Sequence, residues 1–254
     1  ISERALATIR DYTRRLALAL GTVGCLNIQY AVADEVVYVI EANPRASRTV
    51  PYVSKATGVS WIDVACNILA GRPLRELDVP DEPRLDGYFV KEVVLPFDKF
   101  PHEPVILGPE MRSTGEVMGL DETFALAFAK SQMAVGTPLP LKGNVFFSVR
   151  AEDKPQAAQI AARLVKLGFT LLCTSGTGTY LAAQGVPNTI LKKIVEGRPN
   201  ITDYIKNQDV ALIINTPTRK GLATDEGKVR ASAVMHQIPI ITTLTGAAAA
   251  VTAI

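Results

Sequence analysis

The sequence predicts an α/β protein of two unlike parts, separated by a Gly- and Pro-rich linker at residues 136–140. Before the linker, helical and strand-like stretches follow one another without a fixed order, which is typical of an α+β lobe. After residue 143, short apolar runs alternate regularly with amphipathic stretches, as in a doubly wound parallel sheet. The 254 residues are 48% apolar and 20% charged, so the chain can bury a core of ordinary size.

In the first part, apolar residues at helical spacing predict a helix over residues 3–20. Two β-type runs at 25–32 and 36–43, joined by three residues, predict a hairpin that Pro44 ends. The elements expected after it are a helix at 60–69, a loop at 72–87, a strand at 90–96 and a helix at 123–133. The predicted domains are residues 1–85, a connecting segment at 86–143, and residues 144–254.

In the second part, five apolar runs predict five parallel strands with helices between them. The loops that follow these strands are expected at one edge of the sheet, where such folds bind ligands. The strands are expected at 145–149, 170–173, 189–194, 210–215 and 238–242, a Thr/Ser/Gly loop at 174–179, and helices over 157–167 and 180–184, after Pro199, over 225–237 and after residue 242.

Composition excludes several classes of protein. Residues 144–254 hold twelve basic and seven acidic side chains, an excess that suits a small anionic ligand. A dense Lys/Arg stripe with aromatics is missing, so no nucleic acid is expected as a partner. Three widely spaced cysteines indicate a reducing, cytoplasmic location. Residues 231–254 are uncharged but contain Pro239 and several polar residues, so we expect no membrane span.

A first group of candidate site residues follows the predicted hairpin. Alternation places Glu41 and Asn43 on one face, and Gln29 lies roughly opposite Glu41. Their oxygen atoms suit a hard cation such as Mg²⁺. Arg45 and Arg48 follow, and guanidinium groups suit phosphate. The alternative is a solvated surface hairpin with Arg48 paired to Glu41.

A second group lies at the predicted strand ends of the second part. Residues 174–179 (TSGTGT) follow a strand and precede a helix, so their N–H groups and hydroxyls can face an anion. Lys154 and Asn215 follow two other strands and should open at the same edge. The alternatives are an ordinary strand–helix turn and, for Lys193, a solvated cation near the turn at 197–199.

Longer strings extend the first group. They are EANPRASRTVPYVSKATG at 41–58, KEVVLPF at 91–97 and LGPEMRSTGEVMG at 107–119. With them the chain resembles the carboxyl-terminal ATP-grasp unit of the carbamoyl-phosphate synthase large-subunit family, which uses ATP to phosphorylate carbamate. The resemblance implies a partial ATP-grasp carboxyl-terminal lobe, whose upstream part precedes residue 1. The fragment alone is therefore expected to be inactive.

The same resemblance implies roles for the five residues. Gln29, Glu41 and Asn43 would bind the Mg²⁺ or Mn²⁺ that bridges the ATP phosphates, with K⁺ as a further candidate ion. Arg45 and Arg48 would be catalytic, neutralising phosphate charge.

The second part carries its own matching strings at 144–149, 168–169, 174–177, 195–199 and 213–216. It resembles the methylglyoxal-synthase-like domain that ends this large subunit, which is regulatory and binds nucleotides or related anions. The resemblance implies an effector pocket, with Pro217 standing where some members carry a hydroxyl residue. The implied effector-binding residues are Lys154, Thr174, Thr177, Lys193 and Asn215.

Some members also bind an amino-acid activator, and Glu92 and Thr242 are candidates for that site, although Ile240 replaces an aromatic residue.

Together the two resemblances imply the carboxyl-terminal part of a glutamine- or ammonia-dependent synthase, a ligase of pyrimidine and arginine biosynthesis. Its expected partners are the rest of the large subunit and a small glutaminase subunit or domain; a homo-oligomer is also considered. The alternatives are a free-standing methylglyoxal-synthase-like lyase acting on a triose phosphate, and a non-catalytic nucleotide sensor. The lyase uses an Asp and a His, and neither His102 nor His236 is well placed for that chemistry.

Overall fold

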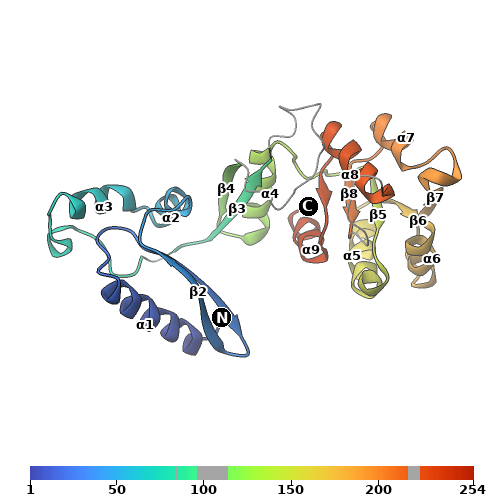
Figure 1. The fold of residues 1–254 in the computed structure, drawn as a ribbon. Helices are drawn as coiled ribbons and strands as arrows, with labels where there is room; N and C mark the ends of the chain where they lie inside the picture. Colours follow the sequence, from blue (N-terminus) through green and yellow to red (C-terminus); the bar gives the residue numbers. More distant parts are fainter. Residues whose placement is uncertain (84, 96–113, 217–223) are drawn as a thin grey trace. The chain divides into compact units, whose positions relative to one another are not determined.

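The computed structural model describes residues 1–83, 85–95, 114–216 and 224–254, and it divides into two compact units (Figure 1). The first unit is Ile1–Asp86 and the second is Gly87–Ile254. Residues 87–143 thus pack with the carboxyl-terminal part of the chain. The division into three domains stays a prediction.

The first unit is built on a helix and a hairpin. Helix α1 (Glu3–Ala19) begins at Ser2, whose hydroxyl accepts a hydrogen bond from the Ala5 N–H at 3.2 Å. Strands β1 (Asn27–Ala33) and β2 (Val36–Asn43) pair antiparallel. The turn residues Asp34 and Glu35 have φ values of 49° and 64°, as a two-residue hairpin turn requires. The predicted helix and hairpin are confirmed.

Two helices follow the hairpin, of which the sequence predicts only the second. They are α2 (Thr49–Thr57) and α3 (Trp61–Leu69), and a short 3₁₀ turn (Leu74–Glu76) comes after them. Helix α2 contains Pro51, which usually signals a break but is tolerated in a first turn, where the N–H has no helical partner. The Trp61 indole N–H donates to Thr57 Oγ1 at 2.9 Å and ties the two helices together.

The second unit opens with a smaller antiparallel layer. Strand β3 (Tyr88–Val94) pairs with β4 (Gly115–Asp121), and helix α4 (Phe124–Val135) packs on both. A Cβ at Gly119 would lie 1.9 Å from the Ala127 carbonyl oxygen, so glycine permits this close approach. The sequence does not predict β4, because two of its seven residues are glycines.

The remainder of the unit is the expected parallel sheet. Its strand order is β7-β6-β5-β8-β9, and every neighbouring pair is parallel, which confirms the doubly wound fold (Figure 1). The strands are β5 (Asn144–Ser148), β6 (Thr170–Thr174), β7 (Thr189–Leu191), β8 (Leu212–Asn215) and β9 (Ile240–Ile241). The helices are α5 (Lys154–Lys166), α6 (Ser175–Ala183), α7 (Ile201–Lys206), α8 (Asp225–Met235) and α9 (Leu244–Ala253), with 3₁₀ turns at Ala151–Asp153 and Ile194–Glu196.

Helices cover both faces of this sheet. Neighbouring residues of β5 point to opposite sides: Phe147 packs in one core with residues of α5, α6 and α9, and Phe146 in the other with residues of α7 and α8. Both rings are nearly inaccessible to solvent. Residues 231–254 form the end of α8, strand β9 and helix α9. None of the described helices is both long and apolar enough to cross a membrane.

The predicted loop at 174–179 is wrong. Strand β6 ends at Thr174, and α6 starts at Ser175 without an intervening loop. The expected helix at 180–184 is only its second half. The small residues allow this packing: at Gly178, a Cβ would come within 2.6 Å of both Asn188 Oδ1 and Ile190 Cγ1.

Strand β6 also carries a buried cysteine. Burial raises the pKa of the Cys173 thiol to about 12, so this thiol stays protonated at neutral pH.

The glycine contacts of α6 yield a matched pair of substitutions. Gly178→Ala should destabilise the parallel sheet by about 1–3 kcal/mol, because the new methyl group clashes with neighbours on β7 and its approach. Gly176→Ala, in the same helix, meets its nearest neighbour at 3.6 Å and should be neutral or stabilising by up to ~1 kcal/mol. Hydrogen exchange of the β5 and β8 amides measures the stability of this sheet; equal exchange in the two variants would contradict the packing.

Candidate functional site

The first candidate site is the open end of the β1–β2 hairpin. Gln29 lies directly opposite Glu41 in the strand register, which confirms the predicted juxtaposition. Asn43, two residues further on, donates from Nδ2 to Glu41 Oε1 at 3.0 Å. Gln29 and Glu41 are exposed, and Asn43 is half-buried. Three oxygen-bearing side chains therefore gather at one end of the hairpin.

The chemistry of this group fits a hard divalent cation. It offers one carboxylate and two amide oxygens, and the hydrogen bond from Asn43 engages only one carboxylate oxygen. Such a cation would complete its coordination shell with water or phosphate oxygens. Among the described residues, no group of three or more His, Cys, Asp and Glu side chains forms a different metal site.

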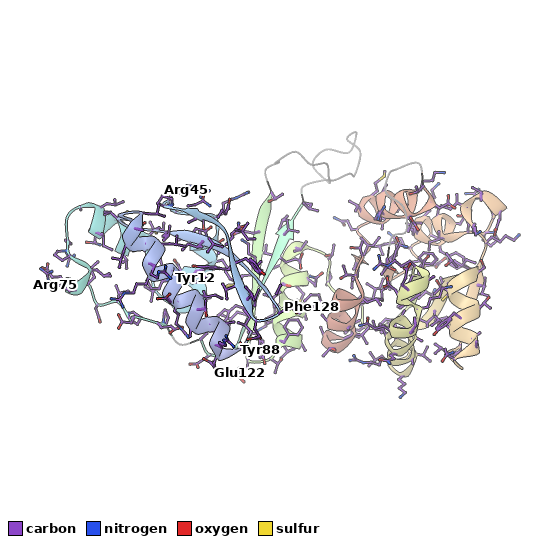
Figure 2. The ribbon with its side chains drawn as sticks, turned by 60° about the horizontal axis from the view of Figure 1, so that its bottom comes forward. Tyr12, Arg45, Arg75, Tyr88, Glu122 and Phe128 are labelled. Carbon is purple, nitrogen blue, oxygen red and sulfur yellow. The ribbon has the colours of Figure 1, made fainter. Side chains whose placement is uncertain are left out.

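The two arginines follow the hairpin in different settings. Arg45, labelled in Figure 2, is exposed, and its Nη1 donates to the Ala46 carbonyl oxygen at 3.1 Å. Arg48 is exposed at the start of α2. No ion pair joins Arg48 to Glu41, so the alternative of a mutually neutralised pair is not what the structure shows.

Arg45 also borders a cavity of about 350 Å³ in the first unit. Its wall comes from the start of β1, the segment before α2, and helices α2 and α3, and most lining side chains are apolar. Gln29, Glu41 and Asn43 do not line it.

The second candidate site is a cavity of about 380 Å³ in the second unit, at the carboxyl ends of β5, β6 and β8. The predicted residues Thr174, Lys193 and Asn215 all line it. Lys154 is close by, since its Nζ lies 3.6 Å from the position that a Cβ on the lining residue Gly176 would take. Four of the five predicted residues therefore meet at this edge.

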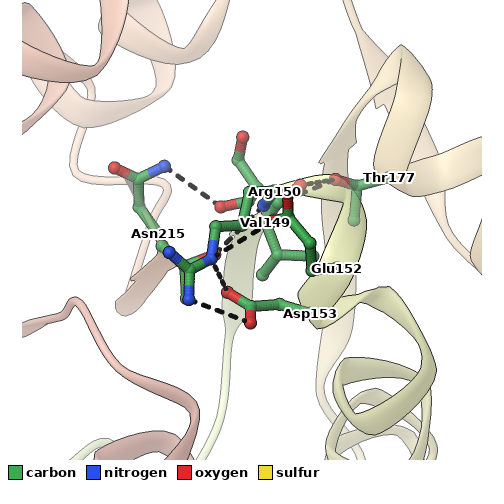
Figure 3. Close-up of polar contacts among 8 residues, drawn as sticks. Val149, Arg150, Glu152, Asp153, Thr177 and Asn215 are labelled. Carbon is green, nitrogen blue, oxygen red and sulfur yellow. Dashed lines mark hydrogen bonds and ion pairs between the residues drawn. The ribbon is translucent and has the colours of Figure 1, made fainter. Parts of the chain in front are cut away.

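The fifth, Thr177, has a different place from the one predicted. It is buried on the inner side of α6, where its Oγ1 accepts from the Val149 N–H at 3.2 Å (Figure 3). Thr174 donates to the same oxygen at 3.3 Å. Thr177 does not line the cavity, so in this structure it holds β5 and α6 together. Because 174–179 was expected to be a loop, helical phase could not be used to separate its inner side from its outer side.

Asn215 is the most enclosed polar group of the cavity. Its side chain is 2% exposed, and its Nδ2 donates to the Ser148 carbonyl oxygen at 3.0 Å (Figure 3). Its Oδ1 is buried without a hydrogen-bond partner. A buried oxygen of this kind favours a ligand that brings a hydroxyl or N–H donor.

Four polar lining residues lie outside both the predicted set and the segment 174–179. Ser148 and Lys192 lie at strand ends, and the acidic residues Asp225 and Glu226 open helix α8. The rule that ligands meet the carboxyl ends of strands could have identified Ser148. It could not have identified the acidic pair, because residues 217–223 separate α8 from β8. The lining of the cavity therefore contains both cationic side chains and carboxylates.

Next to the cavity lies a polar network between the β5 loop and the end of β8 (Figure 3). Arg150 donates from Nε to Asp153 Oδ2 at 2.8 Å, and its backbone N–H donates to Thr216 Oγ1 at 3.0 Å. Burial acts to raise the pKa of Asp153, but the hydrogen bonds from Thr216 and Arg150, with the charge of Arg150, hold this pKa below its ordinary value.

The proposed activator residues are not joined by a hydrogen bond. Glu92 lies on β3 and accepts from Gln132 Nε2 at 3.0 Å, and Thr242 is exposed after β9. His236 ends α8, with its Nδ1 2.8 Å from the Ser232 carbonyl oxygen. His102 and Pro217 lie outside the described residues.

Comparison with known proteins assigns a family to both parts of the chain. Residues 1–77 match the family model of the carbamoyl-phosphate synthase L chain ATP-binding domain, and residues 156–242 match that of the MGS-like domain. Proteins named carbamoyl phosphate synthase large chain align along the whole chain: that of Rhodopirellula baltica is 52% identical over 257 residues, and that of Archaeoglobus fulgidus is 52% identical over 255.

The chain spans only 24% of the length of each of these two relatives. It spans 64% of a Methanosarcina barkeri protein of the same name, to which it is 46% identical. The chain therefore belongs to the family of carbamoyl phosphate synthase large chains, of which it carries a segment of the ATP-binding domain followed by an MGS-like domain.

Proposed function

We propose that this chain contributes cation ligands to an ATP-dependent phosphorylation of carbamate and carries the effector pocket that regulates it. The observation that supports the proposal best is the cavity at the edge of the parallel sheet, where Lys154, Thr174 and Lys193 gather in the MGS-like domain. A regulatory domain needs a ligand site of its own, and these side chains provide cationic and hydroxyl donors for one.

The lining favours a phosphate ester over a bare phosphate ion. The two lysines suit phosphate oxygens, as do the N–H groups at the start of α6, which the Thr174 side chain does not cap. The Asn215 oxygen and the carboxylates of Asp225 and Glu226 are acceptors, which suit hydroxyl or amino groups. A nucleoside monophosphate presents both kinds of group, so it is the proposed effector class.

The cluster of oxygen-bearing side chains at the hairpin is the proposed site of the phosphorylation chemistry. Gln29, Glu41 and Asn43 would hold Mg²⁺ or Mn²⁺ against the ATP phosphates, and Arg45 and Arg48 would neutralise phosphate charge. K⁺ is a further proposed ion. The rest of the large chain, a glutaminase partner and a cytoplasmic location belong to the same proposal, as does an amino-acid activator at Glu92 and Thr242.

The pocket predicts a defined pattern of binding to the 254-residue chain. Calorimetric titration with UMP, CMP, AMP, GMP and IMP should show binding of at least one, and Lys154→Ala should weaken it about tenfold or more through loss of a charge-assisted hydrogen bond. Lys166→Ala, a lysine at the far end of the same helix, is the matched control and should leave the Kd unchanged. If Lys154→Ala binds as tightly as the unsubstituted chain, the pocket assignment is wrong.

The hairpin cluster predicts a loss of turnover in the complete synthase. Glu41→Gln should lower kcat about 100-fold and raise the Mg²⁺ concentration needed for half-maximal rate, because it removes the only carboxylate of the cluster. Glu35→Gln, at the turn of the same hairpin, should leave both unchanged. The isolated 254-residue chain should hydrolyse no ATP; turnover comparable with that of the whole synthase would contradict the proposal.

A free-standing lyase and a non-catalytic nucleotide sensor are the competing functions. The sensor describes the MGS-like domain alone and leaves the hairpin cluster without a role. The lyase should release inorganic phosphate from dihydroxyacetone phosphate. We expect none, because no described histidine lines the cavity and the His236 ring is engaged at the end of α8. Phosphate release above background that Lys154→Ala abolishes would support the lyase.

A further inference from the structure

Two residues that neither line the cavity nor belong to the predicted set connect its two sides. Thr216 follows Asn215, and Asp153 precedes Lys154, so each is adjacent in sequence to a proposed effector ligand. Thr216 is 4% exposed, and its hydroxyl acts to lower the pKa of the Asp153 carboxyl. Its hydroxyl oxygen accepts from the Arg150 N–H at 3.0 Å and therefore has its proton available for the carboxylate.

Both oxygen atoms of the Asp153 carboxylate accept hydrogen bonds in this network. The carboxylate receives the Arg150 guanidinium through two donors, at 2.8 Å to Oδ2 and 3.4 Å to Oδ1. Although Asp153 stands at the N-cap position of α5, its side chain accepts no capping hydrogen bond from the helix. Its lowered pKa shows that the surrounding donors stabilise the ionised form.

Backbone contacts hold the other side of the network. The Thr216 N–H donates to the Ser148 carbonyl oxygen at 3.1 Å, and the same oxygen accepts from Asn215 Nδ2 at 3.0 Å. The end of β8 is thereby tied to the end of β5. The side chains of Thr216 and Asp153 extend this tie into the loop that leads to α5.

We infer that Asp153 and Thr216 are positioning residues that lock the loop after β5 to the end of β8. Through this lock they fix Lys154 and Asn215 in the geometry that receives an effector. The inference rests on the proposed effector pocket for its ligand, while the lock itself is a property of the protein without ligand. Neither residue needs to touch the ligand, since each acts through its neighbour in sequence.

Substitution of Asp153 separates positioning from simple electrostatics. Asp153→Asn removes a negative charge near a proposed phosphate site, so electrostatics alone would tighten the binding of an anion. Loss of the lock releases Arg150 and disorders the position of Lys154, which should weaken binding about tenfold instead. Calorimetry of the full 254-residue chain with the five nucleoside monophosphates named above gives the sign of the effect; tighter or unchanged binding would overturn the inference.

Substitution of Thr216 tests the lock without any ligand. Thr216→Val removes the hydroxyl that accepts from the Arg150 N–H and should speed exchange of the Arg150 amide at least about tenfold by NMR. Thr216→Ser restores the hydroxyl and should preserve both the amide protection and the Kd, which covers the case in which the valine variant folds poorly. Thr252→Val, which removes a hydroxyl on α9, is the matched control and should change neither.

The outcomes distinguish a failure of the proposed effector pocket from a failure of the proposed positioning role. If the unsubstituted chain binds none of the five monophosphates, the proposed effector pocket fails, while the Arg150 amide still decides whether the lock exists. If Thr216→Val binds the effector with the original Kd, or if its Arg150 amide stays protected, the positioning role is wrong.

Discussion

The parallel arrangement of β5 and β8 is the constraint on which the cavity and the proposed effector site depend. The two strands lie side by side although more than sixty residues separate them in the sequence, and their register places Ser148 opposite Asn215. At this point of the strand order, the chain leaves β5 toward β6 on one side and enters β9 from β8 on the other. No crossover helix lies over the gap at such a switch point, so a cavity forms there. The proposed lock between Asp153 and Thr216 would add side-chain contacts to an arrangement that the backbone already dictates.

In the first unit, the turn and the register of the hairpin bring the polar side chains together. Its turn fixes which residues face each other, and an irregularity between Gln29 and Tyr30 shifts the register before the cluster is reached. Because side chains alternate along a strand, a shift of one residue would move Glu41 to the other face. The oxygen cluster therefore depends on the bulge as well as on the turn. The sequence shows the turn residues, but it gives no signal for the bulge.

The sequence was sufficient to predict the elements that local chemistry determines. It was insufficient for the elements that tertiary packing determines. Alternation and apolar periodicity predicted all five parallel strands and the pairing of Gln29 with Glu41. Helix α2, strand β4 and the first half of α6 were missed, because Pro51 and several glycines are poor helix or strand formers in isolation. In each case a tertiary contact overrides the local preference, such as the close approach of α4 to Gly119. The inward direction of Thr177 was missed for the same reason.

The Gly- and Pro-rich segment at 136–140 was interpreted as a linker, but the packing around it is continuous. Helix α4, which precedes it, contacts α9 at the end of the chain, and α9 follows β9, the neighbour of β8 in the sheet. Gly136 ends α4 in the left-handed conformation, and the Thr137 N–H still donates to the Gln132 carbonyl oxygen at 3.1 Å. Gln132 in turn holds Glu92 on β3. The segment at 136–140 therefore lies between elements that pack against each other, and it is not a free hinge. Helix α4 thus contacts both the β3–β4 layer and the last helix of the parallel-sheet layer, and this packing joins the two layers of the second unit.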